Sequence, residues 1–338
     1  MSSSAARQQV LALINGSWAA QVINAAALLQ IPERLADGPK TADALAREVQ
    51  AHAPSLLRLM RALVTLGLCE AAGDGRFALT VAGQFLRGDV QGSVRGRAIL
   101  TGDVLWKWFS DLANMVKTGE RTKAVVSGAD SFEALGGHTE RLNAFQQVMI
   151  ESSTVGVREA MKTYDFSRFK QVIDIGGGNG VVLAELLKAH PGQAGAVFEL
   201  AYIEDRARTY LEAAGVSARG RFLAGSFFDA VPEGFDLYLM KFVIHDWDDD
   251  KAQTILANTR KACGQDAVLV LLEYLVPEVL DQSLKDQAII REDLTMMSVG
   301  GKERTAGEFR ELLAKAGWRL AGITSPGTTF SVIEATPS

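Results

Sequence analysis

The pattern of hydrophobic positions changes near residue 170, and the two parts of the chain predict different kinds of structure. From residue 171 on, short apolar runs rich in β-branched residues alternate with stretches in which apolar positions repeat every three or four residues. The short runs predict buried strands, and the longer period predicts amphipathic helices. Strand candidates are residues 171–176, 195–200, 221–224, 235–244 and 267–276, with a closing pair near 318–325 and 329–335. This alternation predicts an α/β domain whose parallel sheet is covered by helices on both faces.

The first hundred residues have a mostly helical pattern. Thr41 is a candidate N-cap for a helix through about residue 50, and Pro54 opens a second helix that Gly67 ends. Residues 68–80 then predict a hairpin, because two short strands flank an Asp-Gly turn. Two short helices followed by a hairpin predict a winged helix.

The stretch from Val10 to Ile31 is apolar enough to raise the question of a membrane span. Several polar residues interrupt it: Asn15, Ser17, Gln21, Asn24 and Gln30. A buried or dimer-forming helix therefore explains this stretch better than a span. We expect no membrane partner and a homodimer built through the first hundred residues.

A winged helix also raises the hypothesis of a DNA-binding regulator. The helix that would read DNA offers Arg58 and Arg61 among many leucines, and the net charge of the chain is −5. DNA binding needs a concentrated basic patch, so nucleic acid is not the expected partner. A hydrophobic content of 48% with 22% charged residues is typical of a globular enzyme. The two cysteines lie far apart without a motif, which predicts reduced thiols of a cytoplasmic protein.

With 338 residues, the chain is long enough for more than one domain. We expect a winged-helix-like dimerisation domain over residues 1–100 and an α/β domain over residues 171–338. Between them, residues 101–170 have a helical pattern with aromatic and Met-containing stretches. We expect that segment to be a helical linker that lines the substrate.

The first strand of the α/β part ends in a glycine-rich turn. Asp174 is followed by Gly176, Gly178 and Gly180, and a helical pattern begins at once. Glycines suit unusual dihedral angles and a close approach of a ligand, and the helix presents free N–H groups. Glu199 ends the next strand about 25 residues later, near the interval at which an acid binds ribose hydroxyls. The spacing D-x-G-x-G-x-G departs from the dinucleotide pattern, which disfavours an NAD-dependent dehydrogenase.

Three titratable residues fall at the same edge of the predicted sheet. His245 follows the fourth strand, Glu273 interrupts an otherwise apolar fifth strand, and Glu303 precedes a helix. Ligands of open α/β sheets bind at the carboxyl ends of the strands. A carboxylate in an apolar strand is unfavourable unless it has a partner or a task. These residues therefore form the candidate catalytic group.

The glycine loop, the sequence HDW at residues 245–247 and the sequence GKERT at residues 301–305, in this order, resemble the plant-type small-molecule O-methyltransferases. Those enzymes use S-adenosylmethionine (SAM), and their bacterial relatives methylate phenazines, polyketides and other aromatic natural products. The resemblance covers nearly the whole chain, including the dimerisation domain. It implies a Rossmann-like SAM-binding domain and transfer of a methyl group to a phenolic hydroxyl of a small aromatic substrate.

The resemblance also implies roles for individual residues. His245 is the general base, and Glu273 and Glu303 are its flanking acids. The implied cofactor contacts are Ser153, Asp174, Gly176, Gly178, Gly180, Glu199 at the ribose, Gly225, Ser226, Phe227 and Lys241 near the adenine. The implied substrate contacts are Phe145, Met149, Asp246 and Met296. One departure is that the family usually has an aspartate, which binds the adenine amine, where this chain has Ser226.

Some alternatives stay open. A relative that binds SAM without transferring methyl is the second hypothesis, which the retained His245 disfavours. No metal ion is expected, because the magnesium-dependent catechol-type methyltransferases carry acidic ligands in place of this histidine. The aromatic substrate is not identified by any motif, and methylation of a ring nitrogen is also open.

Overall fold

The computed structural model of the chain describes residues 3–122 and 139–338, and it describes their side chains except at residues 139–146. The chain forms two compact units. Unit 1 consists of Met1–Asp111 and Val126–Met149, and unit 2 consists of Leu112–Val125 and Ile150–Ser338.

Unit 1 begins with the long helix α1 (Ser3–Leu28), followed by the short helix α2 (Ile31–Arg34). The winged-helix prediction is confirmed by α3 (Ala42–Glu48), α4 (Ala53–Thr65) and a hairpin of β2 (Cys69–Ala71) and β3 (Arg76–Leu79). Thr41 caps α3 as predicted, because its side chain accepts a hydrogen bond from the backbone N–H of Ala44. The sequence did not predict β1 (Lys40–Thr41), which pairs with β3 and is too short to show a period.

The helical pattern that continues along the chain is also confirmed for the described residues. It contains α5 (Val81–Gln84), α6 (Arg95–Ile99), a π-helix η1 (Leu100–Leu105), α7 (Trp106–Phe109), α8 (Leu112–Thr118) and α10 (Thr139–Thr163). Among the described residues, one helix, α1, is long and apolar enough to cross a membrane. This is weak evidence for a span, because core helices of soluble proteins have the same length and composition.

Unit 2 contains a mixed sheet of seven strands in the order β6-β5-β4-β7-β8-β10-β9. The strands are β4 (Gln171–Ile175), β5 (Ala194–Glu199), β6 (Gly220–Ala224), β7 (Leu237–Lys241), β8 (Val268–Tyr274), β9 (Trp318–Thr324) and β10 (Phe330–Pro337). Each predicted strand is present. The sheet is not parallel throughout, because β10 runs antiparallel to both β8 and β9. The α/β fold class is confirmed.

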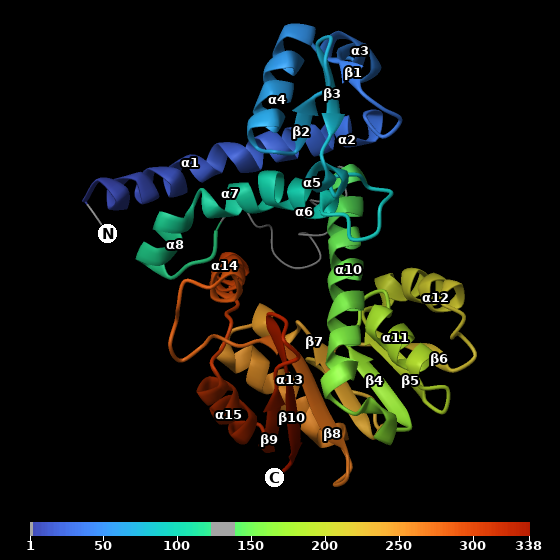
Figure 1. Cartoon of the computed structure of the whole chain (residues 1–338). Coiled ribbons are helices and arrows are strands. Elements are labelled where there is room, and N and C mark those ends of the chain that lie inside the picture. The colour runs from blue at the N-terminus through green and yellow to red at the C-terminus, as the bar shows by residue number, and fades with distance from the viewer. Residues whose placement is uncertain (1–2, 123–138) are drawn as a thin grey trace. The chain divides into compact units, whose positions relative to one another are not determined.

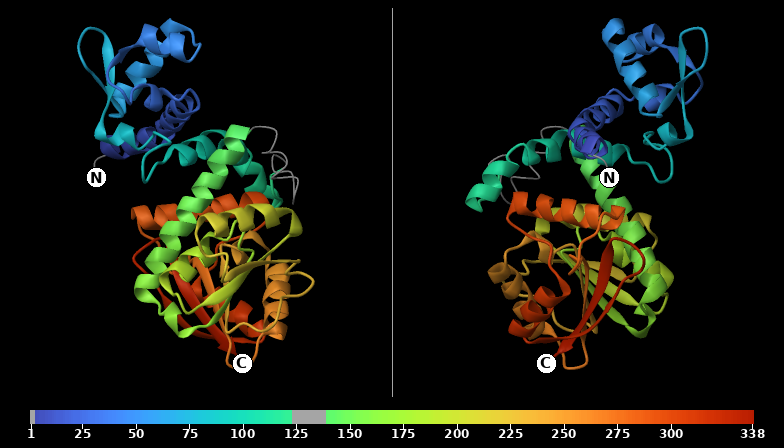
Figure 2. Two further views of the ribbon diagram at one scale, coloured as in Figure 1. Left: turned by 90° about the vertical axis from the view of Figure 1, so that its right-hand side faces the viewer. Right: turned by 60° about the vertical axis from the view of Figure 1, so that its left-hand side comes forward.

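Helices cover both faces of this sheet (Figures 1 and 2). The end of α10, with α11 (Val181–Ala189) and α12 (Glu204–Ala213), packs on one face. On the other face lie α13 (Asp249–Ala262) and α15 (Ala306–Lys315). The remaining helices are α14 (Leu284–Val299) and three 3₁₀ turns, η2 (Phe166–Arg168), η3 (Ala201–Ile203) and η4 (Ile244–Asp246). Each face of the sheet thus has its own apolar core.

The predicted fourth strand, residues 235–244, is too long at its carboxyl end. Strand β7 ends at Lys241, because Phe242 adopts a left-handed conformation with φ of 54°. The next two N–H groups, of Val243 and Ile244, donate to the Glu273 side chain instead of to a neighbouring strand. His245 therefore lies on the single turn η4, which the chain enters by a sharp bend.

Candidate active site

The glycine turn between β4 and α11 has a backbone that side chains would disturb. Gly176, Gly178 and Gly180 have φ of 67°, 53° and 79°. A Cβ at Gly176 would lie 2.9 Å from Val243, and one at Gly180 would lie 2.8 Å from Val197. A Cβ at Gly178, in contrast, would have no protein atom within 4 Å. The space above Gly178 is therefore open to a ligand.

Two carboxyl groups border this turn. Glu199 accepts hydrogen bonds from the N–H of Gly178 at 3.3 Å and from the N–H of Leu200 at 2.8 Å. Asp174 is 1% exposed, and burial raises its pKa to about 7. Its Oδ2 has no hydrogen-bond partner among the described residues. A Cβ at Gly177, which the sequence analysis did not single out, would lie 2.6 Å from this carboxyl group.

The residues after β6 lie at the same edge of the sheet, beyond the end of its outermost strand. Gly225 is required by packing, since a Cβ there would lie 2.5 Å from the ring of Phe198. The Ser226 hydroxyl accepts a hydrogen bond from the N–H of Phe228 at 3.2 Å, so its own proton is left to donate. Phe227 packs edge-to-face against Phe228 and Trp247, with ring centroids 4.9 and 6.2 Å apart. This aromatic cluster extends from the end of β6 to the residue that follows η4.

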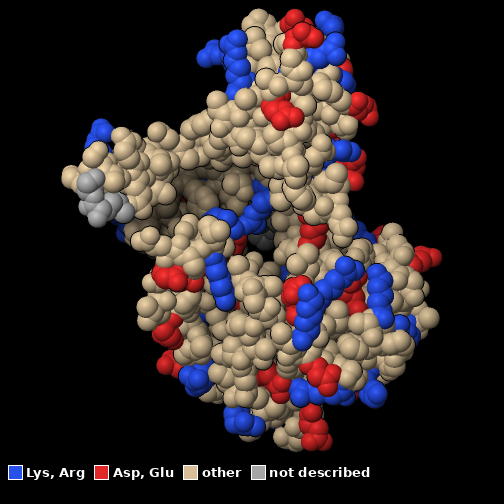
Figure 3. All heavy atoms as spheres, in the orientation of Figure 1, with Lys and Arg blue, Asp and Glu red and all other residues tan. Residues whose placement is uncertain are grey.

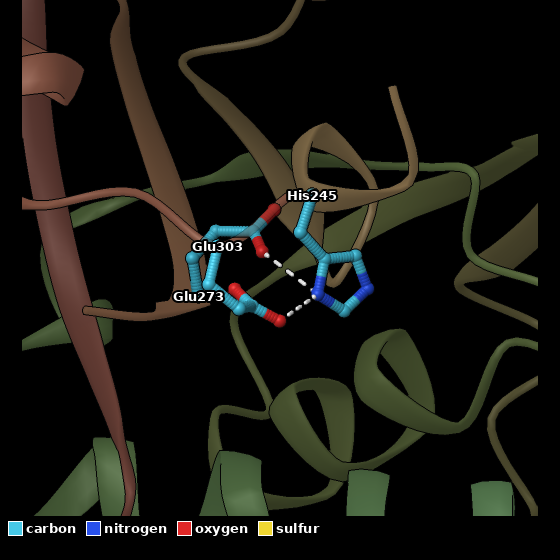
Figure 4. A group of neighbouring side chains, drawn as sticks. All are labelled: His245, Glu273 and Glu303. Atoms are coloured by element: carbon cyan, nitrogen blue, oxygen red, sulfur yellow. Dashed lines mark hydrogen bonds and ion pairs between the residues drawn. The ribbon is translucent and has the colours of Figure 1, made fainter. Parts of the chain in front are cut away.

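His245, Glu273 and Glu303 come together as the sequence predicted (Figure 4). The Nδ1 atom of His245 lies 2.7 Å from Oε1 of Glu303 and 3.7 Å from Oε2 of Glu273. All three side chains are buried, with residue exposures of 7%, 0% and 4%. The other oxygen of Glu273, Oε1, accepts from the N–H groups of Val243 and Ile244 at 3.1 and 2.9 Å.

The charges around His245 favour its protonated form. Burial by itself lowers the pKa of this imidazole, but Glu273, Asp246 and Glu303 together raise it to about 10. Burial also raises the pKa of Glu273, to about 7, and that of Glu303. The two acids and the base are thus arranged to hold a positive charge on the ring.

The second ring nitrogen of His245 is the one open to a substrate. Because a carboxylate accepts, Nδ1 carries a hydrogen and donates it to Glu303, so in the neutral form of the imidazole the lone pair is on Nε2. The nearest described acid to Nε2 is Asp246, whose Oδ1 lies 3.6 Å away and whose side chain is 48% exposed. The ring of Phe242 stacks on the imidazole at a centroid distance of 5.2 Å. This arrangement can accept a proton at Nε2.

Lys241 lies at the end of β7, between β4 and β8 in the sheet. Its Nζ sits 3.9 Å from the centroid of the Phe242 ring. Burial lowers its pKa to about 8, against the opposing effect of the carboxylates of Glu273, Asp174 and Asp246. Strands β4 and β5 separate it from β6, and Ser226 lies two residues after the end of β6. The predicted contact of Lys241 with the adenine stays a prediction.

The remaining predicted residues are described only in part. Ser153 is buried on the part of α10 that belongs to unit 2, and Met296 is half-buried on α14. Met149 is 37% exposed on the part of α10 that belongs to unit 1. The side chain of Phe145 is outside the described residues. Their roles in binding cofactor or substrate stay predictions.

The segment 301–304 contributes more than the sequence analysis assigned to it. Gly301 packs against η4 so closely that a Cβ would lie 2.0 Å from the His245 carbonyl oxygen. Arg304 is fully buried and donates hydrogen bonds to two carbonyls around η4. The N–H of Glu303 donates to Asp293 at 2.9 Å. The sequence offered no signal for Arg304, because its burial is seen only in the structure.

Comparison with known proteins places the chain in a family. Residues 109–319 match the O-methyltransferase domain family, and residues 11–88 match the O-methyltransferase dimerisation domain family. The chain belongs to the O-methyltransferase family. The resemblance seen in the sequence motifs and the predicted enzyme class are therefore confirmed.

Individual relatives agree over nearly their whole length. The chain is 36% identical to O-demethylpuromycin-O-methyltransferase of Streptomyces alboniger, over 98% of this chain and 89% of that protein. The solved structure of mitomycin 7-O-methyltransferase has a TM-score of 0.90 and 32% identity, and the match covers 99% of this O-methyltransferase and 98% of that chain. A third relative is an O-methyltransferase from neocarzinostatin biosynthesis, solved with SAM and 2-hydroxy-5-methyl naphthoic acid. Its structure has a TM-score of 0.81 and 30% identity, and the match covers 95% of this chain and 96% of that chain.

Proposed function

We propose that this O-methyltransferase transfers the methyl group of SAM to a phenolic hydroxyl of a small aromatic natural product, with His245 as the general base. The observation that carries the proposal is the buried His245–Glu303 hydrogen bond of 2.7 Å, which leaves Nε2 of the imidazole to accept a proton. The relatives support the substrate class, because the neocarzinostatin enzyme was solved with a hydroxylated naphthoic acid.

The residues of unit 2 fit SAM as the cofactor. The open space at Gly178, the acidic Glu199 at the end of β5 and the N-terminus of α11 would hold the amino-acid and ribose parts. The unpartnered Oδ2 of Asp174 is a buried acceptor beneath the loop. When bound, SAM supplies a methyl group on a sulfonium, and the positive charge of that sulfonium opposes protonation of nearby bases.

The raised pKa of His245 removes an energetic difficulty. A phenol has a pKa of about 10 and an ordinary imidazole about 6.5, so proton transfer between them is uphill by roughly 5 kcal/mol. With its pKa raised to about 10, His245 matches the phenol. The same shift means that the resting imidazole is protonated at neutral pH, so turnover requires its deprotonated fraction. Activity should therefore rise with pH above neutrality.

Glu303 and Glu273 support the base in different ways. Glu303 orients the ring through Nδ1, as the third group does in nucleophile–base–orienter triads. Glu273 does not make a hydrogen bond of good length to the ring, but its charge lies 3.7 Å from Nδ1 and stabilises the imidazolium. Asp246, beside Nε2, is placed to accept a hydrogen bond from a hydroxylated substrate.

A metal-dependent reaction is the competing use of these side chains. The ligand atoms of His245, Glu273 and Glu303 lie within 4.8 Å of one another. Divalent metals bind imidazole nitrogens and carboxylates of this kind. Here the 2.7 Å hydrogen bond already uses Nδ1, which favours an orienting pair over a metal ligand. We therefore propose a metal-independent reaction. Dialysis against a chelator should leave the rate unchanged.

We also propose that the enzyme is a cytoplasmic homodimer with neither a membrane nor a nucleic-acid partner. Helix α1 carries a single charged residue, Arg7, and its surface is largely uncharged in Figure 3. Its exposed apolar side chains are Val10, Leu13, Ile14 and Trp18, at 55%, 75%, 63% and 45% exposure. A second copy of the chain would bury them, since this helix lies largely in the dimerisation-domain match. Light scattering giving a monomer mass at micromolar concentration would contradict this.

One assay tests the proposed function. Purified enzyme is given SAM and a panel of hydroxylated aromatics that includes phenazines, naphthoates, anthraquinones and simple phenols, with matched aromatic amines. Release of S-adenosylhomocysteine (SAH) with a hydroxylated compound supports the proposal. Release with the amines alone would move the reaction to nitrogen. Tight SAM binding without SAH release from any compound would favour the hypothesis of a SAM-binding relative without transfer.

A further inference from the structure

The turn η4 has few and long hydrogen bonds within its own backbone. It is a single 3₁₀ turn of three residues, entered through the left-handed Phe242 with φ of 54°. A non-glycine residue in that conformation is strained by about 1 kcal/mol or more. The local bonds are long, since the N–H groups of Asp246 and Trp247 donate to the carbonyls of Val243 and Ile244 at 3.3 Å. The later carbonyls of such a short helix have no partner inside it. Groups outside the turn must therefore hold His245 in place.

Glu273 accepts the N–H groups of Val243 and Ile244, and the Lys302 N–H donates to the His245 carbonyl at 2.9 Å. Arg304 supplies the side-chain donors to the carbonyls of the turn. Its Nη1 donates to the carbonyl oxygen of Ile244 at 3.0 Å, and its Nη2 donates to that of Trp247 at 2.8 Å. These two carbonyls flank His245 and Asp246, so one planar guanidinium bridges the turn. Its Nε and Nη2 also donate to Oδ1 of Asp249, at 3.0 and 2.8 Å.

Arg304 is itself held beside the end of β8. Its side chain is 0% exposed, so these contacts are shielded from water. The backbone of Arg304 forms a bridge with Leu275, and its carbonyl accepts from the N–H of Val276 at 3.0 Å. Both residues directly follow β8, the strand that carries Glu273. The orienter Glu303 is the preceding residue in the chain.

A lysine would not reproduce these contacts. A guanidinium presents its N–H groups in a rigid planar fork, whereas an ammonium is a single flexible donor centre. The fork reaches two carbonyls and a carboxylate at once. Arginine thus fits a task that needs several fixed directions from one buried group.

We propose that Arg304 is the positioning residue of the general base: it fixes η4 so that Nδ1 of His245 meets Glu303 and Nε2 faces the acceptor hydroxyl. The inference rests on the proposed function. It predicts that Arg304 affects catalysis through His245, and that it contacts neither cofactor nor substrate.

The first test needs no substrate. Protein labelled with ¹⁵N-histidine contains four histidines, and the His245 signals are identified by their loss in His245→Ala. In Arg304→Met the His245 pKa should move towards the ordinary value of about 6.5 and the preference for a proton on Nδ1 should weaken. The control is Arg260→Met, which removes another partly buried arginine that donates to backbone carbonyls, those of Gly317 and Cys263. That control should leave the His245 titration as in the wild type.

The second test uses turnover. Arg304→Met should lower kcat by about 10²-fold, the loss typical of a misplaced catalytic group, with unchanged SAH affinity by calorimetry. In a His245→Ala background the same substitution should cause no further loss of kcat. An unchanged His245 titration in folded Arg304→Met would overturn the proposal. An equal loss of kcat with and without His245 would also overturn it.

Two outcomes keep the interpretation clear. If Arg304→Met does not fold, Arg304→Lys keeps the charge without the fork and should shift the His245 titration part of the way; a wild-type titration in that variant contradicts positioning. If wild-type enzyme releases no SAH from any aromatic compound while the titration shift is seen, the proposed function fails and the positioning role stands.

Discussion

The two halves of the candidate site lie on one edge of one sheet and are built in opposite ways. The cofactor half is shaped by the absence of side chains, at Gly176, Gly178 and Gly180 within a single turn. The catalytic half is shaped by the side chains of Glu273 and Arg304, which contact the Ile244 backbone of η4 from 29 and 60 residues away in sequence. Local backbone geometry makes the first half, and long-range hydrogen bonds make the second.

The comparison predicts that a side chain on the glycine turn will be more damaging than any single change at η4. Gly178→Val should abolish SAM binding, because a branched side chain at φ of 53° would be strained and would fill the open space. Calorimetry with SAH measures this. Gly192→Val is the control, since a Cβ there also has no protein atom within 4 Å but φ is not left-handed. Equal SAH affinity in both variants would remove the cofactor from this loop.

The catalytic half should show the reverse behaviour, with rate lost and affinity kept. His245→Ala should lower kcat by about 10²- to 10⁴-fold, the usual contribution of a general base, while SAM affinity stays nearly the same. Both rates should rise with pH towards about 10, because His245 and a phenol have similar pKa values, so the two enzymes are compared at the same pH. If the variant keeps most of its activity at neutral pH, His245 is not the base.

A smaller loss of SAM affinity is expected from Glu199, whose side chain contacts the glycine turn. Glu199→Ala removes the acceptor for the Gly178 N–H and the acid proposed to bind the ribose. Loss of hydrogen bonds to a polar group of this kind weakens binding by about 1–3 kcal/mol, or roughly 5- to 150-fold in the Kd of SAM. Titration calorimetry tests the change, and kcat at saturating SAM should stay within a few-fold of the wild type.

The two acids next to His245 should differ from each other. Glu303→Gln keeps the shape but removes the charge next to Nδ1, so the His245 pKa should fall and the pH–rate profile should move to lower pH. A loss in kcat of about 10-fold is expected, since the acid orients the base without taking the proton. Glu273→Ala should lower the unfolding free energy more than Glu303→Ala, because it removes the acceptor of two backbone N–H bonds of η4. Equal stability of the two alanine variants in urea would contradict this.

The last expected effect is on how the free energy of unfolding depends on pH. A base whose pKa is about 10 in the folded protein and about 6.5 when unfolded stabilises the fold below pH 6.5. This contribution is lost as the pH rises towards 10. Between pH 7 and 10 the wild type should thus lose stability faster than His245→Ala, by at most about 1.4 kcal/mol per pH unit. Urea unfolding at several pH values measures the difference.

What could be predicted from the sequence follows the same division. The strands of unit 2 and the glycine turn were predicted because their signals are local: β-branched apolar runs, glycines at fixed spacing and an acid at a strand end. The meeting of His245, Glu273 and Glu303 was also predicted, since strand ends of one sheet share an edge.

The details of η4 could not be predicted, because no local pattern encodes them. The left-handed Phe242 that ends β7 early is a bulky residue that rarely adopts such a conformation. The two N–H groups that follow Phe242 donate to Glu273, a residue distant in sequence, so a local pattern does not show them. The antiparallel placement of β10 also depends on pairing across the sheet. Lys241 was expected near the adenine by resemblance alone, and that contact stays a prediction.

The unequal tasks of the two acids have a consequence for redesign of the enzyme. Glu303 touches the imidazole through one oxygen, so its identity sets the basicity of His245 with little effect on the course of the chain. Glu273 serves the ring by its charge and terminates a strand by accepting two N–H groups. An engineer who wants the enzyme to work at another pH, or on a more acidic phenol, should therefore diversify position 303 and leave position 273 unchanged.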